Sequence, residues 1–155
     1  MISEQIFTKI LSIDQIKINK TFFGSPMKKF INNIYHTYDI PKESFYISLF
    51  YLYKFYLYNK NNVQLMNIFF ENSKSINLFI FTSIVISLKN IYDDKINIKN
   101  MTNTLNINFN DYVRTELIIL KGINWNSNYE TDDYYKFKKY LVLKMDYHQP
   151  KNYSY

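Results

Sequence analysis

The sequence LFIFTSIVISLKNIYDD, residues 78–94, decides the fold class of this chain. It is apolar on every side until it turns polar at Lys89. A helix that is hydrophobic all round is buried all round. Ser83 and Ser87 lie one turn apart and are small, so neighbouring helices can approach closely there. We therefore predict a buried central helix over about residues 76–92, wrapped by the other helices, with Lys89 where it reaches the surface.

A second stretch, NDYVRTELIILKGINW at residues 110–125, predicts a helix that packs beside the central one. Three aliphatic residues recur there at the i, i+4, i+7 spacing of an apolar helical face: Val113, Leu117 and Leu120. Glu116 lies inside this pattern, so Lys89 and Glu116 are expected to emerge on the same surface. Gly122 is interpreted as the residue just past the end of this helix, where glycine is the commonest choice.

The composition restricts the fold and the chemistry of the chain. Its 155 residues correspond to one domain. The absence of cysteine excludes a disulfide framework and thiolate zinc sites, and it suits a reducing compartment. Only 2 glycines and 3 prolines are present, which is few for the turns of an all-β fold, so an all-α fold is predicted. With two histidines and no cysteine, no metal and no cofactor are expected.

The charge and the apolar runs indicate which partners to expect. The net charge is +6, but the lysines are scattered, as on solvated helix faces, so nucleic acid is not an expected partner. The longest apolar run, residues 76–88, is interrupted by Asn77 and Ser83 and is shorter than the roughly 20 residues of a membrane span. We expect no membrane association and a location in the nucleus, the cytoplasm or both.

The two apolar stretches resemble the cyclin box, the helical domain of the cyclins. In that family the third helix ends in small residues, a lysine and an acidic residue, and this chain has ISLKN at 86–90 followed by Asp93 and Asp94. The fifth helix of the family carries a glutamate ahead of apolar residues and a Trp or Phe, and this chain has TELIILKGINW at 115–125. The short, single-box P-type cyclins, which have a double aspartate after the third helix, are the most similar group.

The resemblance implies an architecture for the whole chain. It implies an N-terminal arm or helix at 1–22 and a five-helix cyclin box at 23–126, followed by a flanking helix at 127–148 and a tail at 149–155. Helix starts are expected at Ser25-Pro26 and Pro41, because Ser favours the N-cap and Pro the first helical position. A short helix is expected over 98–105, and residues 63–70 stay open between a helix and an extended link.

The resemblance also implies a function, that of a regulatory subunit, not an enzyme, which binds and activates a cyclin-dependent kinase. In cyclins, the lysine and glutamate that match Lys89 and Glu116 hold the regulatory helix of the kinase. Apolar residues that match Leu78 and Leu120 line the same groove. Ordinary roles also account for these residues, namely a lysine at a helix C-terminus, a solvent-facing glutamate and two core leucines.

Departures from the family leave other functions open. FINNI at 30–34 lacks the arginine of the first box helix, and Tyr53 replaces the aspartate that pairs with it, whereas Lys54 keeps the cation of that run. Because both partners are absent, neither leaves the other as an unpaired buried charge. One alternative is a cyclin-fold scaffold without kinase activation. The other is a transcription-factor-like module that binds protein or nucleic acid.

Overall fold

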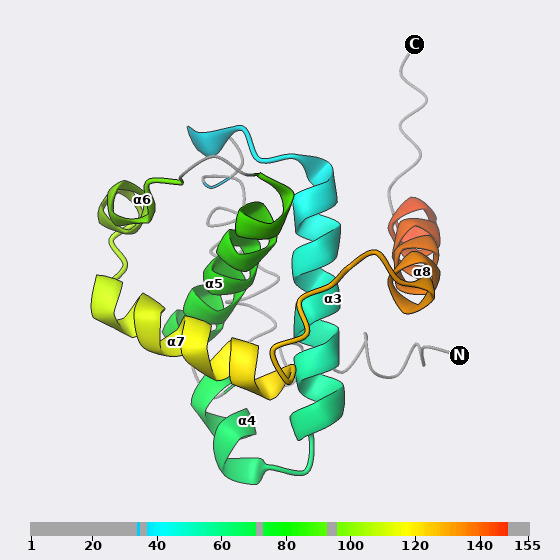
Figure 1. Cartoon of the computed structure of the whole chain (residues 1–155), viewed down its shortest axis with the longest axis horizontal. Coiled ribbons are helices and arrows are strands. Elements are labelled where there is room, and N and C mark those ends of the chain that lie inside the picture. Colours follow the sequence, from blue (N-terminus) through cyan, green and yellow to red (C-terminus); the bar gives the residue numbers. More distant parts are fainter. Residues whose placement is uncertain (1–33, 35–36, 71–72, 93–95, 149–155) are drawn as a thin grey trace.

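The structure, a computed structural model, describes residues 34, 37–70, 73–92 and 96–148, and all the regular elements among them are helices (Figure 1). The predicted all-α class is therefore confirmed. The predictions for the N-terminal arm, the Ser25-Pro26 helix start, the Asp93-Asp94 turn and the tail lie outside the described residues. The helices are α3 (Lys42–Asn59), α4 (Val63–Phe70), α5 (Ser73–Ile91), α6 (Ile98–Thr104), α7 (Phe109–Gly122) and α8 (Asp132–His148).

α5 is the buried helix that the sequence predicted. Every residue from Phe79 to Leu88 is buried, and Lys89 is the first exposed one. Ser87 Oγ lies 2.5 Å from Ser44 Oγ of α3, so two small side chains meet where these helices pack together. The helix begins slightly before the predicted residue 76 and ends at Ile91.

A second helix, α3, is as enclosed as α5, which differs from the single central helix predicted. Its residues from Tyr46 to Tyr56 are buried, except for the half-buried Leu49. Figure 1 shows α3 between α5 on one side and α8 on the other, and it contacts both. The sequence analysis did not predict this burial because α3 contains many tyrosines. The tyrosine ring buries a large apolar area, although the residue also carries a polar hydroxyl. The predicted helix start at Pro41 is confirmed to within one residue, because Pro41 is the N-cap and Lys42 is the first helical residue.

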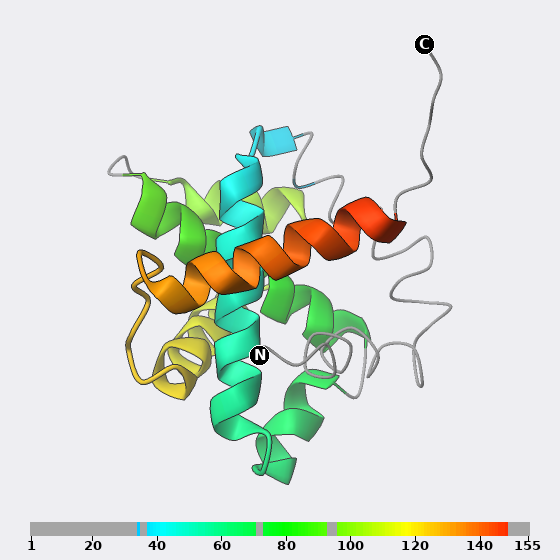
Figure 2. The same cartoon turned by 90° about the vertical axis from the view of Figure 1, so that its right-hand side faces the viewer.

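α8 crosses the outer side of α3 at a steep angle (Figure 2). Three residues at i, i+3 and i+7 form its buried face: Tyr134, Phe137 and Leu141. The Phe137 ring lies 5.6 Å from the Phe50 ring and 5.1 Å from the Tyr53 ring, measured between centroids. Tyr135 and Leu143, two further large hydrophobic residues of this helix, are 58% and 61% exposed. Their aromatic and aliphatic character therefore does not reflect burial.

Glu43, in the first turn of α3, fastens α8 to α3. Its carboxylate accepts hydrogen bonds from Tyr134 Oη at 2.5 Å and from Lys138 Nζ at 2.6 Å. Burial raises the pKa of Glu43, but the hydrogen bonds from Lys138 and Tyr134 outweigh it, and the pKa lies below its ordinary value of 4.5. The ionised carboxylate is therefore the form that holds the two helices together.

Glu43→Gln is expected to remove a pH-dependent part of the stability. Because the pKa of Glu43 is lower in the folded chain, its contribution is complete above about pH 4.5 and disappears as the pH falls through the folded pKa. The pair is partly exposed, so wild type should lose about 1 kcal/mol or less from this group between pH 6 and pH 3. Urea unfolding at both pH values measures this loss. Glu130→Gln, at an exposed position, is the control and should lose as much unfolding free energy between pH 6 and pH 3 as wild type does. An equal loss in wild type and Glu43→Gln would refute the role assigned to the Glu43 carboxylate.

Asparagines shape the short connections around α6. Asn97 Oδ1 accepts from Asn100 N at 3.0 Å and Asn108 Oδ1 accepts from Asp111 N at 3.1 Å, so each caps the helix that follows it. Asn106 has a φ of 57°, a left-handed conformation that asparagine tolerates better than most residues. The short helix predicted over 98–105 is α6, and the open stretch 63–70 is a helix, α4.

Gly122 does not have the role that the sequence suggested. It is the last residue of α7 and has no positive φ, whereas Asn124 and Trp125 have φ values of 56° and 59°. A Cβ atom at position 122 would lie only 2.3 Å from Phe55 Cε2. The glycine is therefore needed because α7 approaches α3 closely at this point, not because the chain turns there.

Candidate partner-binding surface

An ion pair links the last turn of α5 to the middle of α7 at the protein surface. Lys89 Nζ donates to Glu116 Oε2 at 2.8 Å, and the two side chains are 42% and 23% exposed. Tyr112 Oη donates to the same oxygen, and the Lys89 ammonium lies 5.9 Å from the centroid of the Tyr112 ring. The structure thus brings together the lysine and the glutamate that the sequence placed on one surface.

Tyr112 anchors this pair to the core. The Tyr112 side chain is buried, and its ring meets the Phe81 ring edge-on, with 5.8 Å between centroids. Burial and the neighbouring Glu116 carboxylate both raise the pKa of Tyr112, so its hydroxyl stays protonated and donates to Glu116. Both the hydroxyl and the Lys89 ammonium bind Oε2. The position of Glu116 is therefore set by contacts within the protein.

The aliphatic residues beside this pair face solvent, which corrects the expected face of α7. Val113 and Leu117 are 46% and 44% exposed. The buried face of α7 instead consists of three other residues: Tyr112, Thr115 and Ile119. The sequence analysis considered only the aliphatic residues of this helix, but Tyr112 buries an aromatic ring, and Thr115 can be buried because its Oγ1 donates to the Asp111 carbonyl of the preceding turn. Two aliphatic side chains therefore flank Glu116 at the surface.

Leu120 and Leu78, the other predicted site residues, are both half-buried and pack against the core. Leu120 lies one turn beyond Glu116 on α7, so it extends the row of Val113 and Leu117. Leu78 lies about three turns before Lys89 on α5, or about 16 Å along the axis. The structure therefore groups Leu120 with the ion pair and leaves Leu78 at the distant end of α5.

The sequence did not identify Trp125 as a site residue, although it lies next to the same surface. Its side chain is 59% exposed, and its φ of 59° is in a region that large side chains rarely adopt. Residues 125–130 and Asn90, the neighbour of Lys89, line a shallow hollow of about 480 Å³. An exposed tryptophan with a fixed backbone is a common anchor in protein interfaces. A left-handed Asn-Trp pair after a helix has no clear sequence signal, because nothing but tertiary contacts selects it.

Hydrogen bonds from α3 hold the base of this loop. Tyr51 Oη donates to the Ser127 carbonyl at 2.6 Å and accepts from Asn90 Nδ2 at 2.8 Å. Lys54 Nζ donates to the Asn126 carbonyl at 2.6 Å. Burial raises the pKa of Tyr51 to about 12, so this hydroxyl remains a donor at physiological pH. The loop is therefore fixed on the core, and Trp125 projects from a rigid base.

The polar groups of this surface are the Lys89 ammonium, the Glu116 carboxylate that accepts from two donors, and side-chain amides such as that of Asn90. Among the described residues, no group of three or more acidic or histidine side chains is placed to hold a metal ion. None of the described helices is long and apolar enough to cross a membrane.

No family model, curated protein or solved structure shows significant similarity to this chain.

Proposed function

We propose that this protein is a cyclin-like regulatory subunit that binds and activates a cyclin-dependent kinase. The observation that carries the proposal is the Lys89–Glu116 pair, which joins two helices whose sequences resemble the third and fifth helices of the cyclin box. In this proposal α3, α5, α6 and α7 correspond to box helices two to five, and α8 is the flanking helix. The exposed Val113 and Leu117 support it, because a docking surface needs apolar area beside its polar groups.

The energetics of the ion pair favour a role in binding over a role in folding. The two side chains are partly exposed, and exposed pairs typically contribute about 0–1 kcal/mol to stability. A lysine ammonium has three donors, and one is used on Glu116, so Lys89 can bond to a partner without leaving the pair. In a complex the pair would be buried and could no longer form hydrogen bonds with water. Loss of one partner would then leave the other charge buried and unpaired, which weakens binding more than the same loss weakens an exposed pair.

The proposed mechanism is a shift in the conformational population of the kinase. A regulatory subunit that binds the active arrangement more tightly than the inactive one raises the population of the active form by that difference in affinity. Apolar side chains of α5 and α7 would contribute the area, while Lys89 and Glu116 would fix the register of the kinase's regulatory helix. This chain would need no catalytic residue of its own.

Lys89→Ala is expected to weaken kinase binding by about 30-fold or more, because truncation of an interfacial charge pair costs about 2–5 kcal/mol. Its unfolding free energy should change by no more than about 1 kcal/mol. The measurement is capture of cyclin-dependent kinases from the source cell, followed by titration and activation of the kinase recovered. Lys139→Ala, an exposed lysine of α8 on another side of the molecule, is the matched control.

The possible outcomes separate the proposal from its rivals. A kinase that is retained and activated by wild type and Lys139→Ala, but not by Lys89→Ala, supports the proposal. If kinase activation survives in both Lys89→Ala and Glu116→Ala, the assigned surface is wrong. If wild type retains no kinase, the cyclin-fold scaffold without activation becomes the better hypothesis. Binding to DNA with a steep dependence on salt would instead favour the transcription-factor-like module.

A further inference from the structure

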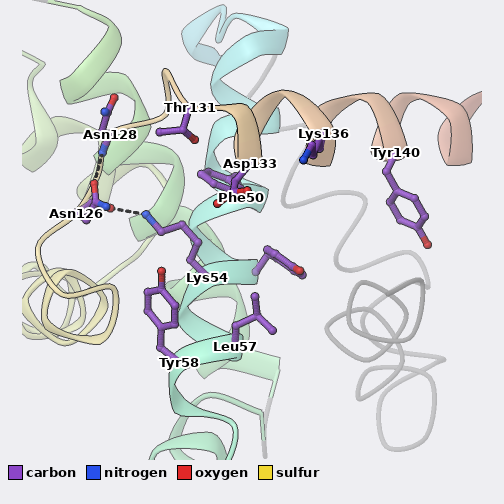
Figure 3. A pocket seen from close by; sticks show the side chains of 11 residues that line it. Phe50, Lys54, Leu57, Tyr58, Asn126, Asn128, Thr131, Asp133, Lys136 and Tyr140 are labelled. Atoms are coloured by element: carbon purple, nitrogen blue, oxygen red, sulfur yellow. Dashed lines mark hydrogen bonds between the residues drawn. The ribbon is translucent and has the colours of Figure 1, made fainter. Parts of the chain in front are cut away.

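A hollow of about 550 Å³ lies between α3, α8 and the loop before α8 (Figure 3). Its size is within the roughly 300–1,000 Å³ of pockets that hold small molecules. It lies apart from the Lys89–Glu116 pair, and none of the residues assigned to kinase binding lines it. The lining residues are Phe50, Tyr53, Lys54, Leu57, Tyr58, Asn126, Asn128, Thr131, Asp133, Lys136 and Tyr140.

Lys54 is the unusual residue of this pocket. It is only 7% exposed, although lysine is almost never buried unless it is paired. Its ammonium donates to the Asn126 carbonyl at 2.6 Å and lies 5.3 Å from the centroid of the Phe50 ring. It forms no ion pair with any carboxylate that the structure describes. An ammonium has three donors, so Lys54 brings hydrogen-bonding capacity into the pocket together with a positive charge.

The other polar groups leave the pocket with one excess positive charge. Lys136 lies on α8 and Lys54 on α3 (Figure 3), and Asp133 is the one carboxylate among the lining residues. Two ammonium groups and one carboxylate sum to +1. Burial lowers the pKa of Lys54, and the negative charge of Asp133 partly offsets this effect. A ligand with a single negative charge would therefore balance the lining, whereas a dianion would also meet repulsion from Asp133.

The loop side of the pocket has a defined shape and can donate hydrogen bonds. Asn126 Oδ1 accepts from Asn128 N at 3.3 Å, and Asn128 Oδ1 accepts from Glu130 N at 3.0 Å (Figure 3 shows the first bond). The side-chain amide nitrogens of Asn126 and Asn128 are the donors that these two residues offer to a ligand. The rings of Phe50 and Tyr53 and the side chain of Leu57 give the lining an apolar part as well. The pocket thus offers a cation for an anionic group and apolar side chains for the rest of a ligand.

From this geometry we infer that the pocket binds a small monocarboxylate with an apolar body, its carboxylate bound by the Lys54 ammonium and attracted by the charge of Lys136. The carboxylate would supply the acceptor that the buried ammonium lacks among the described carboxylates. The apolar body would lie against the Phe50 and Leu57 side. This inference does not rest on the proposed kinase binding: Lys89, Glu116, Leu78 and Leu120 do not line this pocket, although Asn126 and Asn128 also line the hollow beside Trp125.

Phenylacetate is the probe that tests this inference, and phenylacetamide is its neutral isostere. Binding to the full chain is followed by heteronuclear NMR, with the backbone amides of Asn126 and Asn128 as local reporters, at constant ionic strength. Phenylacetate should bind saturably at millimolar concentrations, and phenylacetamide should bind at least about tenfold more weakly, because it lacks the charge. Inorganic phosphate is the third probe, and it should bind more weakly than phenylacetate.

Three variants identify the residues responsible. Lys54→Met keeps the length of the side chain and should weaken phenylacetate binding by about tenfold or more. Lys136→Met changes an exposed residue that cannot affect folding strongly, and it should weaken binding by about three- to tenfold. Lys139→Met, an exposed lysine of α8 outside the pocket, should have no effect.

Four results would overturn the inference. They are the absence of saturable phenylacetate binding, equal binding of the amide and the acid, tighter binding of phosphate, and equal effects of Lys136→Met and Lys139→Met. The Lys136→Met comparison stays decisive if Lys54→Met fails to fold. None of these measurements involves a kinase, so failure of this inference is distinguishable from failure of the proposed function.

Discussion

Phe81→Ala is expected to lower the free energy of unfolding by about 3–5 kcal/mol, the usual cost of truncating a buried phenylalanine. The Phe81 side chain is fully buried in the middle of α5 and packs edge-on against Tyr112 of α7. Its removal leaves a cavity between the two helices, and close-packed interiors collapse only partially around such cavities. Because small domains are stable by only about 5–15 kcal/mol, this is a large part of the total.

Urea unfolding, followed by circular dichroism, measures this loss. Leu143→Ala is a matched control, since Leu143 is 61% exposed and its truncation should change the unfolding free energy by about 0.5 kcal/mol or less. The Tyr112 ring also loses its support, so Phe81→Ala should disturb the hydrogen bond from Tyr112 to Glu116. A loss below about 1 kcal/mol would mean that α5 and α7 are not packed as described.

Gly122→Val is expected to cost about 3 kcal/mol, at the upper end of the range for overpacked sites. The added Cβ alone would lie 2.3 and 2.4 Å from two ring atoms of Phe55, and 3.1 Å from Asn59 Nδ2. The Phe55 ring cannot move aside easily, because it is fully buried and packs edge-on against Phe79 at 5.0 Å. The helix propensity of valine exceeds that of glycine by only a few tenths of a kcal/mol, so the clash dominates.

A double-mutant cycle with Phe55→Leu tests this mechanism. Leucine removes the ring atoms that the new side chain would meet, so the two substitutions together should cost less than the sum of their separate costs. Lys121→Val, at the exposed neighbouring position, reports the effect of valine on the helix without the clash. Additive losses in the cycle would refute the role assigned to Gly122.

These two substitutions act on the contacts that form the proposed binding surface. Tyr112 connects Glu116 to Phe81 in the core, and Gly122 lets the far end of α7 approach α3. Lys89 itself contributes little to the fold, because its pair is partly exposed. We therefore expect Lys89→Ala to weaken binding with little change in stability, and Phe81→Ala mainly to lower stability.

The sequence by itself determined the all-α class, the start of α3, the position of α6 and the buried nature of α5. The run of apolar residues ending at Lys89 allows no exposed face, so no tertiary information was needed to identify that helix. Pro41 and the asparagines around α6 likewise specify local conformations through their own covalent and hydrogen-bonding properties. The joint emergence of Lys89 and Glu116 also followed from the sequence, once the two helices were expected to pack together.

The tertiary structure alone decided which face of α7 is buried, why position 122 is glycine and where the charge of Lys54 lies. Tyrosine and threonine can be buried or exposed, and the choice depends on the neighbours that pack against Tyr112 and Thr115. The requirement for Gly122 comes from Phe55, a residue far away in the chain. The Lys54 ammonium bonds to the carbonyl of Asn126, a residue 72 positions further along the chain. Such contacts join segments distant in sequence, and no local pattern records them.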